Sequence, residues 1–343
     1  MTVTTMRASV LHDRETVTVD EVPVAPLDPD QVRVRVEAVG VCGSDVHYFH
    51  EMRIGDFVVE EPMILGHESA GTIVEVGADV PADRVGERVS IEPQRACRVC
   101  AQCKAGRYNL CPSMEFYATP PIDGAFAEYA VIQADYAHRI PDSMSIEAAA
   151  LCEPLSVGIW ANRKAGTEPG SRVLIAGAGP IGIVAAQVAR AFGASEVIVS
   201  DIVELRREQA LRLGATRVID PTAESADDEL GGLEVDAFID ASGAAPAVRA
   251  GILAVRPAGR VVLVGMGKPD LELPVARIQN RELLVTGVFR YAGTWPLAIE
   301  LAATGRVDLD ALVSGRFGLD RVEEALTTAT DAATLKNIVT PTA

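Results

Sequence analysis

The stretch RVLIAGAGPIGIVAAQVARAFGA, residues 172–194, joins a short apolar strand, a glycine-rich turn and a helix. Gly177, Gly179 and Gly182 form a GxGxxG pattern where the strand passes into the helix. In a βαβ unit the first glycine permits a tight turn, the second lets the backbone approach a pyrophosphate, and the third lets the helix pack closely on the strand. In this context the pattern predicts a dinucleotide-binding domain, although three glycines in a turn would not do so alone.

The residues after the glycines bear on which dinucleotide is bound. Pro180 and Ile181 lie in the first helical turn, where N–H groups bind phosphate and a proline loses nothing by lacking a donor. Asp201 ends the next apolar strand, EVIVSD, where a carboxylate accepts hydrogen bonds from an adenosine ribose and repels a 2′-phosphate. NAD is therefore favoured over NADP. Arg206 is a further candidate contact to the cofactor that weakens this preference slightly, unless it lies with Arg207 on the exposed face of the next helix.

The surrounding segments extend this pattern to a whole domain. Apolar, β-branched runs recur as RVLIAG, EVIVSD, RVID, VDAFIDASG, RVVLVG and LLVTGVF, and helical stretches separate the first of them. Buried parallel strands alternating with helices predict an α/β fold, with a doubly wound Rossmann sheet over residues 154–290. Residues 1–153 read as strands and loops; QVRVRVEAVG (31–40) alternates Val with charged residues, as a strand with one solvated face does. Helix-like segments in residues 291–343 are expected to return to that β-rich domain.

Cysteines gather in CRVCAQCKAGRYNLC, at Cys97, Cys100, Cys103 and Cys111. This spacing can surround one tetrahedral Zn²⁺, and a site with four thiolates has no position left for a substrate. A lobe over about residues 93–113 is therefore predicted to hold a structural zinc. A disulfide cluster would need an oxidising compartment, and the N-terminal residues read as strand rather than as a signal peptide. An iron–sulfur cluster uses similar ligation and stays open on these residues alone.

A second set of potential metal ligands is spread over three segments. The candidates are Cys42, Ser44 and His47 in VCGSDVH, His67 and Glu68 in LGHESAG, and Glu153 in CEPLSVG. One thiolate, one imidazole and carboxylates would form a mixed site with an open coordination position, which is typical of catalytic zinc. Taken singly, a cysteine is more often a small core residue and a glutamate a surface charge, and the separations do not prove that these segments meet.

The chain resembles the zinc-dependent medium-chain dehydrogenase/reductase superfamily. The resemblance is carried by motifs that follow the superfamily's order: Cys42 and His47, GHE at 66–68, the four-cysteine lobe and GAGPIG at 177–182. The finer similarity is to the polyol branch, the sorbitol (L-iditol) and xylitol dehydrogenases. It is carried by CGSDVHY (42–48), PMILGHESAG (62–71), IEP (91–93), MEFYATPPIDGAFAEY (114–129), EPLSVGIW (153–160) and FRYAGTWP (289–296). The resemblance covers nearly the whole chain and implies a GroES-like catalytic domain in addition to the Rossmann domain.

The resemblance implies roles for the second ligand set. Cys42, His67 and Glu68 are expected to hold a catalytic zinc, and Glu153 is expected beside the metal and its water. Cys152 lies one position before Glu153. On an extended segment the two side chains would point in opposite directions, which assigns Glu153 to the site and Cys152 to the core.

The resemblance also implies a proton path and a substrate pocket. Ser44 and His47 resemble the superfamily's proton relay, which also uses a cofactor ribose hydroxyl. The pocket for a polyol is expected to be lined by Tyr48, Phe116, Thr119, Arg290 and Tyr291. Ordinary core packing is the competing interpretation for Tyr48 and Phe116.

The implied reaction moves a hydride from a secondary alcohol of a sugar alcohol to NAD and leaves a ketose, with two zinc ions per chain. The alternative is a related dehydrogenase that acts on a simple alcohol, threonine, an aldose or a sugar acid. A non-catalytic nucleotide-binding protein is disfavoured, because such a chain should have lost metal ligands, and Cys42, His67, Glu68 and Glu153 are all present.

Composition excludes other classes of function. The 343 residues carry a formal net charge of −17, which speaks against nucleic acid and anionic membranes as partners. No apolar run reaches the ~18 residues of a membrane span. The expectation is a cytoplasmic homo-oligomer, with a tetramer favoured and a dimer possible.

Overall fold

The computed structural model describes residues 4–268 and 270–342 and divides into two compact units. The first unit comprises Met1–Glu153, Trp295–Ala303 and Leu309–Ala343, and the second Pro154–Thr294 and Thr304–Asp308. The chain thus leaves the first unit after Glu153 and returns at Trp295, rather than at residue 291 as predicted, and residues 304–308 belong to the second unit. Within the described residues, no helix combines the length and apolarity that a bilayer span requires.

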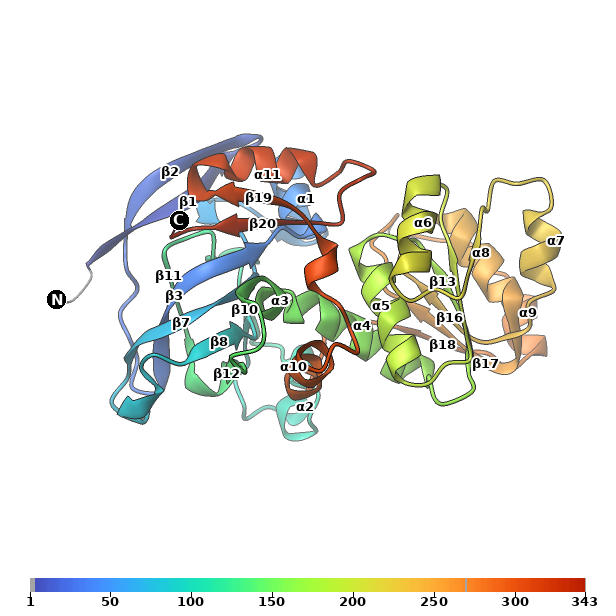
Figure 1. Cartoon of the computed structure of the whole chain (residues 1–343), viewed down its shortest axis with the longest axis horizontal. Helices are drawn as coiled ribbons and strands as arrows, with labels where there is room; N and C mark the ends of the chain where they lie inside the picture. The colour runs from blue at the N-terminus through green and yellow to red at the C-terminus, as the bar shows by residue number, and fades with distance from the viewer. Residues whose placement is uncertain (1–3, 269, 343) are drawn as a thin grey trace. The chain divides into compact units, whose positions relative to one another are not determined.

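The first unit is built mainly of antiparallel strands (Figure 1). Its strands are β1 (Thr5–Asp13), β2 (Thr16–Pro23), β3 (Gln31–Gly40), β4 (Arg53–Ile54), β5 (Phe57–Val58), β6 (Met63–Ile64), β7 (Glu68–Val76), β8 (Arg88–Ile91), β9 (Gln94–Arg95), β10 (Glu115–Phe116), β11 (Tyr129–Gln133), β12 (Ala137–Arg139), β19 (Val313–Gly318) and β20 (Lys336–Thr340). Its helices are α1 (Gly43–Glu51), α2 (Ala101–Lys104), α3 (Ile146–Ala150), α10 (Trp295–Ala303) and α11 (Val322–Thr328), with 3-10 turns η1 (Ala82–Arg84), η2 (Tyr108–Leu110), η3 (Ala134–Tyr136), η4 (Asp310–Leu312) and η5 (Leu319–Arg321). The largest sheet has the order β12-β8-β7-β3-β20-β19, and β11 also pairs with β3.

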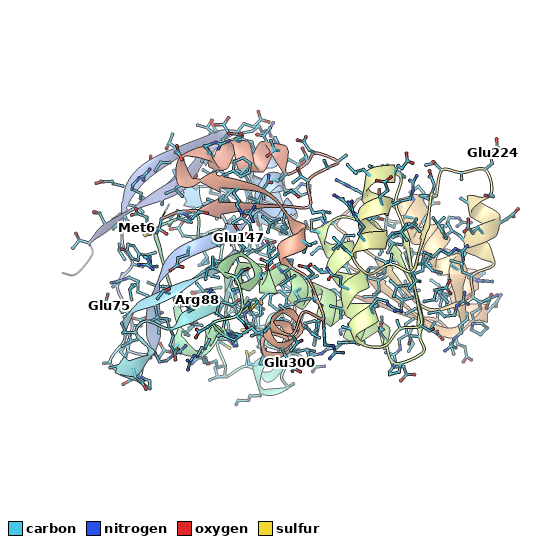
Figure 2. All side chains as sticks on the ribbon, viewed as in Figure 1. Met6, Glu75, Arg88, Glu147, Glu224 and Glu300 are labelled. Carbon is cyan, nitrogen blue, oxygen red and sulfur yellow. The ribbon has the colours of Figure 1, made fainter. Side chains whose placement is uncertain are left out.

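The central strand β3 is more buried than its alternating sequence predicts. Arg33 is only 5% exposed, so the prediction of a solvated face is wrong at this position. Its guanidinium donates to the Ala25 carbonyl at 3.0 Å and pairs with Glu75 of β7, which is labelled in Figure 2. Arg35, two positions further, is exposed. The alternating sequence predicts the strand correctly. It does not show that other segments supply the partners that a buried arginine needs.

Contacts between distant segments hold the C-terminal strands in this sheet. Glu147 of α3 accepts two hydrogen bonds from Arg316 of β19, each at 2.7 Å. Arg88 of β8 donates to the carbonyl oxygen of Met144 at 2.8 Å, just before α3; Figure 2 labels Glu147 and Arg88. These contacts matter for the site, because β20, next to β19, carries Lys336.

The second unit has the predicted doubly wound sheet. Its strands are β13 (Arg172–Ala176), β14 (Glu196–Ser200), β15 (Arg217–Ile219), β16 (Val235–Asp240), β17 (Val255–Leu263) and β18 (Leu284–Gly287), and its helices are α4 (Cys152–Ala165, beginning in the first unit), α5 (Pro180–Ala191), α6 (Glu204–Arg212), α7 (Ala226–Gly231), α8 (Ala245–Ala254) and α9 (Val275–Asn280). The described strands are all parallel, in the order β15-β14-β13-β16-β17-β18. The chain order reverses between β13 and β16, which is where ligands bind in such sheets. Helices α5, α6 and α8 lie beside the sheet in Figure 1.

Candidate functional site

Three of the predicted metal ligands meet in the first unit. Cys42, His67 and Glu68 offer ligand atoms that all lie within 4.8 Å of one another. Cys42 directly precedes α1, whereas His67 and Glu68 stand at the start of β7, where Glu68 pairs with Gly40 at the end of β3. His67 is 6% exposed and Glu68 is fully buried. Two adjacent strand ends and a helix start therefore bring Cys42 to His67 and Glu68, which lie 25 and 26 positions later in the sequence.

The two oxygens of Glu68 have different surroundings. Oε1 accepts a hydrogen bond from the ammonium of Lys336, which also donates to the Val41 carbonyl at 2.9 Å. Oε2 is buried and has no hydrogen-bond partner within the described residues. A Cβ at Gly40 would lie 2.1 Å from this oxygen, so only glycine leaves room for the carboxylate. A buried anionic oxygen without a donor is costly unless a cation binds it, which fits a metal ligand.

Lys336 was not among the residues predicted from the sequence. It is 3% exposed in β20. Burial lowers the pKa of Lys336, but the charges of Glu68 and Cys42 outweigh burial and leave the pKa above its ordinary value. A lysine within the apolar strand KNIVT was the available signal, since a buried lysine nearly always has a partner.

Asp45 is a second residue that the sequence reasoning missed. It is fully buried in α1, and its Oδ1 lies 3.7 Å from Nδ1 of His67. Its Oδ2 accepts from the Cys42 N–H at 2.9 Å, and Oδ1 accepts from the Gly66 N–H at 3.0 Å. A fixed carboxylate beside a ligand imidazole sets the orientation of the ring. Burial lowers the pKa of His67, but Asp45 and then Cys42 outweigh burial, so that the pKa is well above its ordinary value.

Glu153 and Cys152 lie at a helix start, which corrects the argument made from the sequence. The segment is not extended, because α4 begins at Cys152. Cys152 is nevertheless fully buried and hydrogen-bonded to Ser90. Burial raises the pKa of this thiol to about 12, so the thiol stays protonated and is a poor metal ligand. Glu153 is 5% exposed, and its negative charge helps to raise the pKa of Lys336. Its carboxylate is not among the ligand atoms that lie within 4.8 Å of one another.

The predicted proton relay lies along α1. Ser44 is partly exposed in the first turn, and His47 follows three positions later, so the two share a helix face. The side chain of His47 is 49% exposed, and its Nδ1 lies 3.8 Å from Oε1 of Glu51. An exposed imidazole can exchange protons with solvent, as the end of a relay must.

The predicted pocket residues fall in both units. Phe116 lies near the metal ligands, since its ring centroid is 5.5 Å from that of His67. Tyr48 is 3% exposed within the hydrophobic core, and the Thr119 N–H donates to the Phe116 carbonyl at 3.1 Å. In the second unit, Tyr291 is fully buried.

Arg290 belongs to the second unit as well. Its guanidinium carbon lies 4.8 Å from the centroid of the Phe289 ring. The backbone φ of Arg290 is 56°. A non-glycine residue in this left-handed region carries strain, which functional sites often hold.

The four cysteines of the predicted lobe form a compact cluster of free thiols. Their Sγ atoms lie within 4.8 Å of one another, and Sγ of Cys97 is 4.0 Å from Sγ of Cys103. Zinc–sulfur bonds of ~2.3 Å at tetrahedral angles place sulfurs about 3.8 Å apart, whereas a disulfide is far shorter. The N–H groups of Cys97, Cys100 and Cys103 donate to the sulfurs of Cys111, Cys97 and Cys100, each at 3.4 Å.

The lobe is closed and anchored by ordinary hydrogen bonds. Strands β9 and β10 pair at its base. The Tyr108 hydroxyl donates to Oε1 of Glu92 at 2.7 Å, and Nε2 of His138 lies 3.0 Å from Oε2 of the same carboxylate. Glu92 is 2% exposed, so a buried carboxylate anchors the lobe.

The glycine turn of the second unit has the geometry that phosphate binding needs. Gly177 has a φ of 92°, a left-handed conformation that favours glycine. A Cβ at Gly182 would lie 1.8 Å from the Gly177 carbonyl oxygen, whereas one at Gly179 would meet nothing within 4 Å. Gly179 precedes α5 without a side-chain cap, and Pro180 occupies the first turn. The turn therefore presents backbone N–H groups toward an open space.

Asp201 is fixed by this turn. It is 8% exposed; its Oδ2 accepts from the Ala178 N–H at 2.7 Å and its Oδ1 from the Val203 N–H at 2.8 Å. A carboxylate has about four acceptor positions, so capacity remains for ribose hydroxyls. Arg207 does not lie on an exposed face: it donates to the Asp201 carbonyl at 2.8 Å and pairs with Asp220. Arg206 is partly exposed in α6.

Asp240 was read from the sequence as part of a strand. It ends β16, is 1% exposed, and accepts from the Ser242 N–H and hydroxyl at 3.0 and 2.7 Å. The turn that it fixes abuts the glycine turn, since a Cβ at Gly177 would lie 3.1 Å from the Ala241 carbonyl. Asp240 thus shapes the edge of the sheet where the nucleotide is expected.

Comparison with known proteins identifies the family. The family models "Alcohol dehydrogenase GroES-like domain" and "Zinc-binding dehydrogenase" match residues 28–142 and 180–304. A sorbitol dehydrogenase of Bacillus subtilis is 42% identical over 326 residues, which cover 94% of this chain and 92% of that protein. The chain belongs to the zinc-dependent medium-chain dehydrogenase family. It is therefore an oxidoreductase, as predicted, with the predicted GroES-like and Rossmann-like domains.

Further members of the family extend the comparison. A probable D-xylulose reductase A of Aspergillus clavatus is 42% identical over 327 residues, covering 92% of this chain and 91% of that protein. The crystal structure of a putative zinc-binding dehydrogenase from Sinorhizobium meliloti, bound to NADP, has a TM-score of 0.91 at 32% identity and covers 98% of this chain and 99% of that one. The family implies zinc and a nicotinamide cofactor. The thiol, imidazole and unpartnered carboxylate oxygen fit zinc, and the uncapped glycine turn fits a dinucleotide.

Proposed function

We propose that this chain is a zinc- and NAD-dependent polyol dehydrogenase that oxidises a secondary alcohol of a sugar alcohol to a ketose. The observation that carries the proposal is the mixed set of Cys42, His67 and Glu68, whose ligand atoms lie within 4.8 Å of one another. Such a set leaves a coordination position for an alcohol. Similarity to a sorbitol dehydrogenase and to a D-xylulose reductase supports sugar alcohols as the substrate class.

The residues have separate tasks in this reaction. Zinc, when bound, supplies the Lewis acidity that makes an alcohol hydroxyl acidic, and NAD accepts the hydride. Asp45 orients the His67 ring, and Lys336 fixes Glu68. Ser44 and His47 carry the released proton along α1 to solvent. Glu153, whose negative charge helps to keep Lys336 protonated, adds negative charge near the reacting hydroxyl.

A substrate panel tests this function. Initial rates of NAD reduction are measured with sorbitol, xylitol, galactitol, mannitol, ribitol, threonine and ethanol. We expect the highest kcat/KM with a sugar alcohol. A preference for threonine or ethanol would replace the polyol function by that of a related dehydrogenase.

Asp201 is expected to set the preference for NAD. In Asp201→Asn, one fixed backbone hydrogen bond is retained but the charge is lost, so repulsion of a 2′-phosphate disappears. We expect KM for NAD to rise and the NAD-to-NADP ratio of kcat/KM to fall, each by about tenfold, which corresponds to ~1.4 kcal/mol. Asp220→Asn, which removes a carboxylate that pairs with Arg207 instead, is the matched control and should keep the ratio. Wild-type protein that uses both cofactors equally would contradict this role.

Arg290 is expected to bind polyol hydroxyls. Arg290→Ala should lower kcat/KM for sorbitol or xylitol by ~100-fold and for 2-propanol by less than ~3-fold, because only the polyols carry extra hydroxyls to pair with a guanidinium. Both values come from the same initial-rate assay. An equal loss with both alcohols would assign Arg290 to the cofactor or to the fold.

We also propose a cytoplasmic homo-oligomer, a tetramer in preference to a dimer. Metal-binding thiols favour a reducing compartment. Leu284 and Val285 on the edge strand β18 are 59% and 37% exposed, and an exposed apolar edge favours pairing with a second copy. Light scattering should give four times the 36.3 kDa chain mass, and a monomer would contradict the proposal.

A further inference from the structure

Lys336 contacts a ligand rather than the metal position itself. Its ammonium bonds to Oε1 of Glu68 and to the Val41 carbonyl, and it is 3% exposed. It reaches the site from β20, near the C-terminal end of the chain, across the strand pair that β20 forms with the end of β3. In its ion pair with Glu68, both side chains are buried.

Glu68 itself has little freedom to move. It is fully buried, and its Oε2 lies so close to Gly40 that a Cβ there would be 2.1 Å away. Loss of the ammonium would therefore leave the carboxylate in place but without its counter-charge. The nearest alternative cation would be the metal held with Cys42 and His67. Charge balance, rather than a change in position, then decides how strongly Glu68 binds the metal.

We propose that Lys336 is a positioning residue for the metal site: it holds Oε1 of Glu68, so that Glu68 reaches the metal through Oε2 alone and only weakly. The inference rests on the proposed zinc site. In this arrangement one negative charge of the ligand set is offset by the ammonium, which keeps the metal electrophilic and its remaining position exchangeable. A hydrogen bond to a ligand carboxylate is a known way in which proteins tune a bound metal.

Two substitutions at Lys336 should act in opposite directions on retention of the metal. Lys336→Met keeps an unbranched side chain without the terminal ammonium, so Glu68 should bind the metal fully and the metal should leave about tenfold more slowly. Lys336→Arg keeps the charge, and its planar fork can engage both carboxylate oxygens. It should then occupy Oε2 as well as Oε1 without moving Glu68, which leaves no free carboxylate oxygen for the metal, and the metal should leave about tenfold faster.

The measurement is the rate at which a coloured chelator removes zinc from the purified holoenzyme, with no alcohol or NAD present. The phase that belongs to this site is the one missing in Cys42→Ser. Faster loss in both variants would overturn the proposal, because a purely structural lysine predicts destabilisation in both cases. If Lys336→Met does not fold, Lys336→Gln takes its place, because it also removes the charge, and zinc loss that is not slower than in the wild type contradicts the proposal. Wild-type protein without a phase that depends on Cys42 would instead overturn the proposed function.

Discussion

Cys42→Ser is expected to abolish NAD reduction with every alcohol, lowering kcat/KM by at least ~10³-fold, while NAD binding stays unchanged. A serine hydroxyl is not ionised at neutral pH, so the metal loses its only thiolate at the mixed site and binds weakly or not at all. The dinucleotide motif and Asp201 belong to the other unit, so they are not altered. Rates and NAD affinity, measured by NAD reduction and by fluorescence titration, separate the two effects.

Cys152→Ala is the matched control for this prediction. It also removes a thiol near the site, but Cys152 is fully buried and protonated, with a bond to Ser90. We expect a loss of stability of about 1 kcal/mol and nearly unchanged turnover. If Cys152→Ala abolishes turnover and Glu153→Gln spares it, the two neighbouring residues have been assigned the wrong way round.

Cys100→Ser is expected to lower the melting temperature by about 10 °C or to abolish soluble expression. Closure of the lobe depends on four sulfurs that lie within 4.8 Å of one another, and between Cys97 and Leu110 the only buried residue is Asn109. Elemental analysis should find two zinc ions per chain in the wild type and one in this variant. Iron and sulfide in place of zinc would contradict the assignment of a structural zinc.

Val99→Ser is the matched control in the same lobe. Val99 is 70% exposed between two of the cysteines, and its side chain is not a metal ligand. Its backbone hydrogen-bonds to Cys97, and Val99→Ser keeps that bond. It should keep both metals and the melting temperature. If Val99→Ser is as damaging as Cys100→Ser, the lobe is sensitive to any change, and the loss of stability does not report on metal binding.

The local motifs of this chain could be predicted from the sequence because each depends on short-range geometry. The glycine pattern needs only a strand and a helix at fixed spacing, and the four cysteines lie within fifteen residues. The Rossmann strands were recognisable because strands buried on both faces are continuously apolar. For VDAFIDASG the strand ends at Asp240, since the carboxylate of this residue caps the turn that follows.

Long-range pairing could not be predicted in this way. Lys336 meets Glu68 only because β20 returns from the end of the chain to pair with β3. Asp45 stands beside His67 for a similar reason, and in the sequence it reads as an ordinary helix-capping aspartate. The helical start at Cys152 was missed because an extended segment was predicted there, whereas the proline of EPLSVG lies in a first helical turn, which tolerates it.

The central claim, hydride transfer from a secondary carbon of a polyol to NAD, is tested most directly by isotopic labelling. The protein is incubated with NAD and sorbitol that carries deuterium at carbons 2 to 5 and hydrogen at carbons 1 and 6. Mass spectrometry of the reduced cofactor then reports which carbon gave the hydride. We predict deuterium in the nicotinamide ring and a ketose as product. Unlabelled reduced cofactor with an aldose as product, or no reduced cofactor at all, would contradict the account.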